Sequence, residues 1–137
     1  MKIVISNDLA AAHAIRRTVF IDEQGYSEAE EWDDLDDHAL ILLAMHGETP
    51  IATARLFVRE EAGVIGRICV LKPYRGTGLG AALVTEGCLR LRAAGCRQAH
   101  LSAQTHAIPF YEKLGFTAHG DAYLDGAIPH RDMEKPL

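Results

Sequence analysis

A glycine-rich turn is the feature of the sequence whose residue types and spacing point most directly to chemistry. An apolar segment, residues 64–71, leads into the turn 75–80, which has glycine at every second position and opens a predicted helix. The first N–H groups of a helix lack partners inside it, its dipole favours negative charge, and glycine lets an anion approach the main chain. Lys72 and Arg75 add positive charge. This combination predicts a phosphate or pyrophosphate site.

Three nucleotide-binding signatures compete for this turn. A Walker A loop needs Gly-Lys-Ser or Gly-Lys-Thr at its end, whereas two alanines follow Gly80. A dinucleotide fingerprint needs an acidic residue about 20 positions later, and none lies between Glu86 and Glu112. The third signature, Arg-x-x-Gly-x-Gly, is satisfied by Arg75, Gly78 and Gly80, and through it the chain resembles the GNAT acetyltransferases. In that family the loop holds the pyrophosphate of coenzyme A.

The resemblance covers nearly the whole chain. Ile65–Gly80 is similar to the main cofactor motif of the family, and Ala107–Phe116 is similar to its second motif. Val19–Gly25, the acidic run after it and Gly126–His130 resemble the small bacterial ElaA-like branch. The resemblance implies acetyl-CoA as the acyl donor. The implied coenzyme A site consists of Cys69, Val70, Leu71, Arg75, Gly76, Thr77, Gly78, Leu79, Gly80, Ala81, Gln104 and Tyr111.

Acetyl transfer from a thioester to an amine needs a neutral nucleophile, a polarised carbonyl and a proton for the departing thiolate. The resemblance implies that the backbone of residues 69–71 pairs with the pantetheine arm like an extra strand, and that one N–H there stabilises the oxyanion. It also implies that Tyr111 is the general acid; the alternative is an aromatic residue that only packs. Many family members have an asparagine seven residues before this tyrosine, where this chain has Gln104.

No general base can be carried over from the family. Some branches place a catalytic glutamate on the strand before the second motif, but Gln98–Ala103 contains no carboxylate. Glu23 and His100 are the candidates, with His38 and an ordered water as further alternatives, since histidine titrates most readily near neutral pH. We expect no metal and no disulfide, because the three cysteines are odd in number and lack Cys-x-x-Cys spacing. They are predicted to be packed thiols: Cys69, Cys88 and Cys96.

The elements that must position these residues follow from the hydrophobic pattern. From Asp8, a plausible N-cap, apolar residues recur at helical spacing, which predicts a helix that ends near Gly25 and turns Arg16 and Arg17 outward. Two further helices are expected, one from the glycine turn to Gly95 and one over His106–Leu114. Strands are predicted over Lys2–Ile5, His38–Met45, Ile51–Val58, Val64–Leu71 and Gln98–Ala103, and extended chain from Phe116 onward.

This order of elements predicts an α/β (α+β) fold with a mixed sheet and helices on its faces. The family resemblance implies the GNAT fold: a mostly antiparallel sheet of six to seven strands, about four flanking helices, and a cofactor cleft splayed between the fourth and fifth strands. With 137 residues and 48% hydrophobic composition, we expect one domain over residues 1–137. The longest apolar run, Ala39–Met45, is far shorter than the roughly 20 residues of a membrane span. Without a signal-peptide apolar region near Lys2, we expect a cytoplasmic protein.

Charge divides unevenly along the chain. Nine of the nineteen acidic residues lie between Asp22 and Asp37, so the net charge of −5 splits into −9 there and +4 elsewhere. This acidic stretch either attracts a cationic amine or forms a solvated face. The remainder is not basic enough to indicate nucleic acid, and no membrane partner is expected.

The resulting prediction is an N-acetyltransferase that moves an acetyl group from coenzyme A to a primary amine of a small molecule or peptide, with a homodimer left open. Arg16, Phe20, Arg55 and the acidic stretch also resemble acyl-homoserine-lactone synthases, which take acyl groups from a carrier protein. An ion-pair network in which Arg55 neutralises Asp33 or Asp36 explains the same residues without catalysis. A non-catalytic acyl-CoA-binding module is the other alternative.

Overall fold

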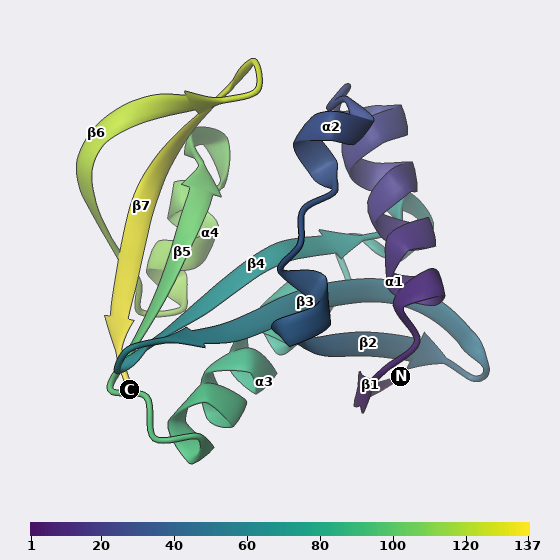
Figure 1. The fold of residues 1–137 in the computed structure, drawn as a ribbon, viewed down its shortest axis with the longest axis horizontal. Helices are drawn as coiled ribbons and strands as arrows, with labels where there is room; N and C mark the ends of the chain where they lie inside the picture. The colour runs from purple at the N-terminus through teal and green to yellow at the C-terminus, as the bar shows by residue number, and fades with distance from the viewer.

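The chain folds around one seven-stranded sheet with the order β1-β2-β3-β4-β5-β7-β6 (Figure 1). The structure is a computed structural model and describes residues 1–137. All neighbouring strands are antiparallel except β4 and β5, which are parallel. The predicted mixed, mostly antiparallel sheet is therefore confirmed. The strands are β1 (Lys2–Ser6), β2 (Leu40–His46), β3 (Thr49–Arg59), β4 (Ala62–Val70), β5 (Gln98–Gln104), β6 (Thr117–Asp125) and β7 (Ile128–Pro136).

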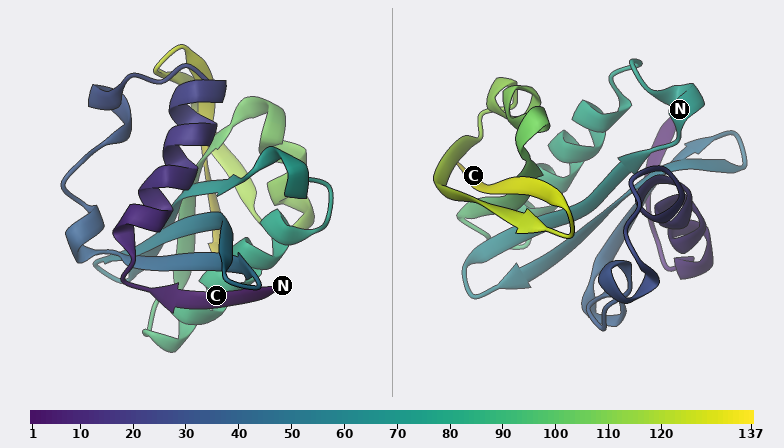
Figure 2. Two further views of the ribbon diagram at one scale, coloured as in Figure 1. Left: turned by 90° about the vertical axis from the view of Figure 1, so that its right-hand side faces the viewer. Right: turned by 90° about the horizontal axis from the view of Figure 1, so that it is seen from above.

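Helices cover both faces of this sheet. The α-helices are α1 (Leu9–Arg16), α2 (Glu28–Glu31), α3 (Leu79–Ala93) and α4 (Ile108–Lys113). A seven-residue π-helix, η1 (Arg17–Glu23), continues α1. The other helical segments are the short 3₁₀ turns η2 (Asp36–His38), η3 (Lys72–Tyr74) and η4 (Thr105–Ala107). Figure 2 shows α1 and α3 on opposite faces of the N-terminal half of the sheet. No helix has the length and apolar character that a membrane span requires.

Two hydrophobic cores result from this layering, because successive residues of a strand point to opposite faces. In β2, Leu42 and Ala44 belong to the larger core under α3, whereas Ile41 and Leu43 belong to a smaller core under α1. Both faces of β2 are thus buried, which explains why its sequence is a continuous apolar run. The three cysteines are buried free thiols, as predicted.

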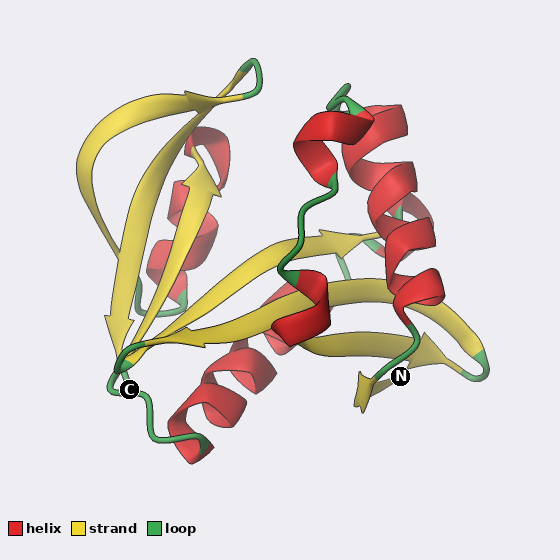
Figure 3. Cartoon of the chain, in the orientation of Figure 1, coloured by secondary structure: helices red, strands yellow, loops and turns green.

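The sheet is split along the boundary between β4 and β5. These strands pair only from Ala62–Val64 to Gln98–His100. Beyond this point they diverge, and the sheet opens as a V (Figure 3). One arm is the part of the sheet that ends in β4, and the other arm consists of β5, β7 and β6. The splayed cleft predicted between the fourth and fifth strands is therefore present.

The first helix differs from its prediction at one residue. Asp8 caps α1 by accepting a hydrogen bond from the Ala11 amide at 3.1 Å, as expected of an N-cap. Arg16, predicted to face outward, is only 1% exposed. It lies four residues after the buried Ala12 and so shares that side of the helix. The carboxylates of Glu31 and Asp36 form ion pairs with its guanidinium there.

Candidate functional site

A cleft of about 330 Å³ lies where β4 and β5 diverge. One wall is the β4 segment from Val64 to Ile68, and the other carries Ser102 and Gln104 of β5 with Tyr111 of α4. Phe20, Gln24 and Tyr26 also line the cleft, as do Asp125 and His130 of the C-terminal hairpin. Segments far apart in sequence therefore meet at the split in the sheet.

The glycine turn leads into α3 in the conformation expected of an anion-binding loop. Gly76 and Gly78 have φ values of +78° and +82°, in the left-handed region that side chains disfavour. Gly78 is the N-cap of α3, and no side chain caps the helix there. The Thr77 hydroxyl donates to the Tyr74 carbonyl at 2.7 Å, which fixes the turn. The first amides of a 15-residue helix are thus left free for a ligand.

Arg75 is held beside this turn by two partners. Its Nε donates to the Val70 carbonyl at 2.8 Å. Its two terminal nitrogens meet the Glu23 carboxylate at 2.9 and 3.0 Å. Glu23, the candidate base, is therefore engaged by a residue of the predicted cofactor site and does not line the cleft.

Tyr111 lines the cleft, as its predicted role requires. Its ring packs edge-to-face against Phe110 and Phe116, with centroids 5.0 and 6.1 Å away. Burial raises the pKa of the Tyr111 hydroxyl to about 12. The phenol is consequently protonated throughout the neutral range, the state a general acid needs.

Gln104 links β5 to the segment that follows η1 at the cleft. Its amide nitrogen donates to Gln24 Oε1 at 2.8 Å, and its oxygen lies 2.7 Å from His106 Nε2. A second bridge runs from the Tyr26 hydroxyl to the Asp125 carbonyl at 3.1 Å. Gln24 and Tyr26 were not among the predicted site residues, because nothing in a local sequence pattern marks a contact between residues 80 or more positions apart.

The acidic stretch is largely an ion-pair network. Arg16 bonds Glu31 at 2.8 Å and Asp36 at 2.7 Å, and these three side chains are buried. Arg55 Nη1 bonds Asp33 at 2.7 Å and also lies 3.2 Å from Asp36. The charged residues that resemble lactone synthases thus pair with one another. This is the ion-pair network that explains these residues without catalysis. Arginines thus neutralise Glu31, Asp33 and Asp36, whereas Asp22, Glu30, Asp34 and Asp37 form no ion pair.

Arg67 completes this network and was not predicted from the sequence. It adopts a φ of +50° at a bulge where β4 shifts register against β3. Its guanidinium lies 3.0 Å from a Glu31 carboxylate oxygen and donates to the Glu31 carbonyl at 2.9 Å. The bulge turns Arg67 toward the cleft wall, where Arg55 and Glu31 also lie.

The histidines fall outside the cleft, with one exception. His100, a candidate base, lies 3.1 Å from Gln98 Oε1, toward the closed end of the V. His38 is exposed on η2. His130 was not selected from the sequence, yet it is buried on the cleft wall, with Nδ1 2.8 Å from the Ile128 carbonyl. Because a carbonyl only accepts, Nδ1 carries the proton and Nε2 is left free to accept one in the neutral ring.

Comparisons with known proteins identify the family of the chain. Residues 8–116 match the family model of the Acetyltransferase (GNAT) family. The Bacillus subtilis protein YyaT is 36% identical over 99% of this chain and 94% of its own length. An acyl-CoA N-acyltransferase from Pseudomonas aeruginosa superposes with a TM-score of 0.85 at 30% identity, over 96% of this chain and 92% of that one.

Escherichia coli ElaA superposes with a TM-score of 0.86 over 98% of this chain and 97% of that one. At 24% identity this similarity is one of fold. The match of the family model covers the glycine turn, the strands β4 and β5 on either side of the cleft, and the helix that carries Tyr111. The chain therefore belongs to the GNAT acetyltransferase family.

Proposed function

We propose that this protein transfers an acetyl group from acetyl-CoA directly to a primary amine, on a small molecule or a peptide, in the cytoplasm. The observation that supports this most is the parting of β4 and β5 beside the uncapped start of α3. This arrangement offers a helix N-terminus for a pyrophosphate, a free strand edge for a pantetheine arm, and a cleft at the end of that edge.

The strand edge also supplies an oxyanion donor. The Leu71 amide donates to the Ile51 carbonyl at 3.0 Å and so points toward β3. Neighbouring residues of a strand direct their N–H groups to opposite edges, so the Val70 amide points to the edge of β4 that faces away from β3. The Val70 carbonyl, which accepts from Arg75, lies on that same edge. Among residues 69–71, Val70 is therefore the donor we assign to the thioester oxygen.

Tyr111 serves as the general acid in this proposal. Its hydroxyl is on the cleft wall and keeps its proton at neutral pH, since burial raises its pKa to about 12. After the amine attacks the thioester carbon, the carbon–sulfur bond breaks and the thiolate takes the phenolic proton. The oxyanion that forms before this step accepts the Val70 N–H.

His130 is the base we assign in place of Glu23 and His100. Glu23 is paired with Arg75, and His100 lies outside the cleft. His130 is the histidine of the cleft wall, and its free Nε2 lies 3.9 Å from Asp125 Oδ2. In the tautomer with a proton on Nδ1, this Nε2 has the lone pair that can take a proton from the amine.

Thiol release from acetyl-CoA tests the function. The full chain is incubated with polyamines, amino acids, amino sugars, aminoglycosides and peptide N-termini, and coenzyme A binding is measured by calorimetry. We expect thiol release with at least one class of amine. Tight coenzyme A binding without release would favour a non-catalytic module, and activity only with an acyl-carrier donor would favour a lactone-synthase-like enzyme.

A further inference from the structure

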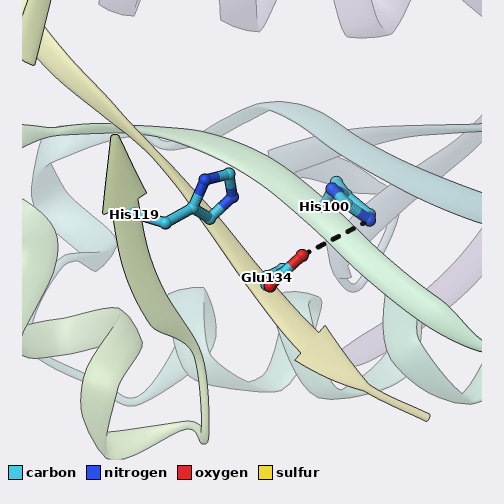
Figure 4. Close-up of side chains that lie close together, drawn as sticks. All are labelled: His100, His119 and Glu134. Carbon is cyan, nitrogen blue, oxygen red and sulfur yellow. Dashed lines mark ion pairs between the residues drawn. The ribbon is translucent and has the colours of Figure 1, made fainter. Parts of the chain in front are cut away.

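A second cluster of side chains lies on the three-stranded arm of the V, outside the cleft. His100 of β5, His119 of β6 and Glu134 of β7 gather on one face of the sheet (Figure 4). One donor atom from each residue lies within 4.8 Å of the other two. His100 Nε2 is 3.9 Å from Glu134 Oε2.

The strand register explains why the three residues meet. His100 and Glu134 are direct partners across β5 and β7, and Glu134 is the direct partner of Thr117 across β7 and β6. His119 follows Thr117 by two residues and so points to the same face. The core residues Ala99 and Leu101 point to the opposite face. Three adjacent strands thus hold the cluster together.

The donors are not committed to other partners. His100 Nε2 has one hydrogen-bond partner, the exposed Gln98 side chain, which can rotate away. The His119 ring is exposed, and the Glu134 side chain is 42% exposed, with its Oε2 3.9 Å from His100 Nε2. Neither His119 nor Glu134 makes a side-chain hydrogen bond within the chain.

We infer that His100, His119 and Glu134 bind one zinc-like divalent ion. Two imidazole nitrogens and one carboxylate suit zinc and its first-row neighbours, whereas magnesium and calcium prefer oxygen donors alone. In a tetrahedral zinc site the donor atoms are about 3.3 Å apart. Side-chain rotations that move the three donor atoms by about 1–2 Å would therefore bring them to the distances of a zinc site. The fourth position is open to water.

The position of the cluster gives the ion a structural role. His100 pairs with Val64, the last β4 residue in register with β5 before the strands part. An ion there would tie β5, β6 and β7 together at the base of the cleft. It would also occupy the lone pair that His100 needs to act as a base. This inference departs from the sequence-based expectations of no metal and of His100 as a candidate base.

Metal titration of the full chain tests the inference. Chelator-treated protein is titrated with Zn²⁺ by calorimetry and with Co²⁺ by visible absorption. We expect one ion per chain. Since loss of even an outer-shell partner costs about 10- to 100-fold in metal affinity, His119→Ala and Glu134→Gln should each weaken binding at least about tenfold. His38→Ala removes an exposed histidine from η2 and is the matched control.

Circular dichroism confirms that each variant is folded, and coenzyme A affinity is measured on the same samples. Failure to acetylate an amine leaves the metal prediction intact, because the cluster lies outside the cleft. The inference is overturned by the absence of saturable one-to-one binding, by unchanged affinity in His119→Ala, or by an equal loss in His38→Ala.

Discussion

The Glu23 carboxylate and the Arg75 guanidinium, 52 residues apart in sequence, form a two-point ion pair with distances of 2.9 and 3.0 Å. Arg75 belongs to the glycine turn, and Glu23 ends η1. The pair joins the proposed pyrophosphate site to the segment that precedes the cleft-lining Gln24 and Tyr26. A pyrophosphate that uses Arg75 must compete with Glu23 for it.

We therefore expect Glu23→Gln to tighten coenzyme A binding. The pair is partly exposed, and such pairs contribute about 0.2–1 kcal/mol, so the dissociation constant should fall by up to about fivefold. Turnover at saturating cofactor should be retained. Calorimetry and steady-state kinetics measure the two effects. The control is Glu28→Gln, which removes a carboxylate of α2 that pairs with Arg17 of η1. A large loss of turnover with unchanged affinity would instead restore Glu23 as the base.

His130→Asn should lower kcat/KM by about 10²- to 10⁴-fold, the usual contribution of general acid–base catalysis. Asparagine keeps a donor near the Ile128 carbonyl but removes the acceptor that Nε2 provides. His46→Asn, on the far end of β2, should leave kcat/KM unchanged. Wild-type kinetics in His130→Asn would leave an ordered water as the base.

Tyr111→Phe should lower turnover by about 10²-fold or more while coenzyme A affinity stays within about twofold. The phenyl ring keeps the contacts with Phe110 and Phe116 and loses only the hydroxyl. Because the folded-state pKa of Tyr111 is raised to about 12, the acid form persists as pH rises and is lost only near that value. Wild-type turnover should therefore show no alkaline decline below about pH 10. Unchanged turnover in Tyr111→Phe would remove the acid role.

Local sequence patterns predicted the elements well, because helix caps, strand alternation and glycine turns act over a few residues. Asp8 caps α1, the glycine turn starts α3, and the apolar run after residue 38 is β2 with both faces buried. His38 itself falls in a short helical turn before that strand. The glycine turn proposed to bind coenzyme A could be selected from the sequence for the same reason, since its residues are contiguous.

Long-range pairing could not be read from local patterns. The charge split along the sequence is partly neutralised in space, because Arg16, Arg55 and Arg67 lie among Glu31, Asp33 and Asp36. His130 reaches the cleft only through the pairing of β7 with β5, in which it opposes Gln104.

Gly78 offers a test of the loop. Its φ of +82° disfavours any side chain, but a Cβ there meets nothing within 4 Å, so substitution strains the backbone without a clash. Gly78→Gln and Gly78→Glu carry the same strain and differ in charge. We expect Gly78→Glu to bind coenzyme A at least about tenfold more weakly than Gly78→Gln, because its carboxylate repels a pyrophosphate at the start of α3. Equal affinities by calorimetry would place the pyrophosphate elsewhere.

The buried carboxylate of Asp36 should dominate the acid sensitivity of the fold. Burial alone would raise the pKa of this carboxyl, but hydrogen bonds from Arg16 and His13 and the charge of Arg16 lower it to about 2. The folded-state pKa thus lies below the unfolded value of about 3.9. The stability it contributes is present above about pH 4 and is lost as pH falls through about 2.

Asp36→Asn removes that charge and leaves Arg16 and Arg55 with fewer carboxylate partners. Breaking a buried ion pair costs about 3–5 kcal/mol, so the free energy of unfolding at pH 7 should fall by about 3 kcal/mol. Between about pH 4 and 2 the variant should also lose stability less steeply than the wild type. Asp37→Asn, an exposed neighbour on η2, should change neither quantity by more than about 0.5 kcal/mol. Urea unfolding at a series of pH values measures the free energy of unfolding and its dependence on pH. Parallel pH profiles for Asp36→Asn and the wild type would show that protonation of Asp36 does not cause the loss of stability in acid.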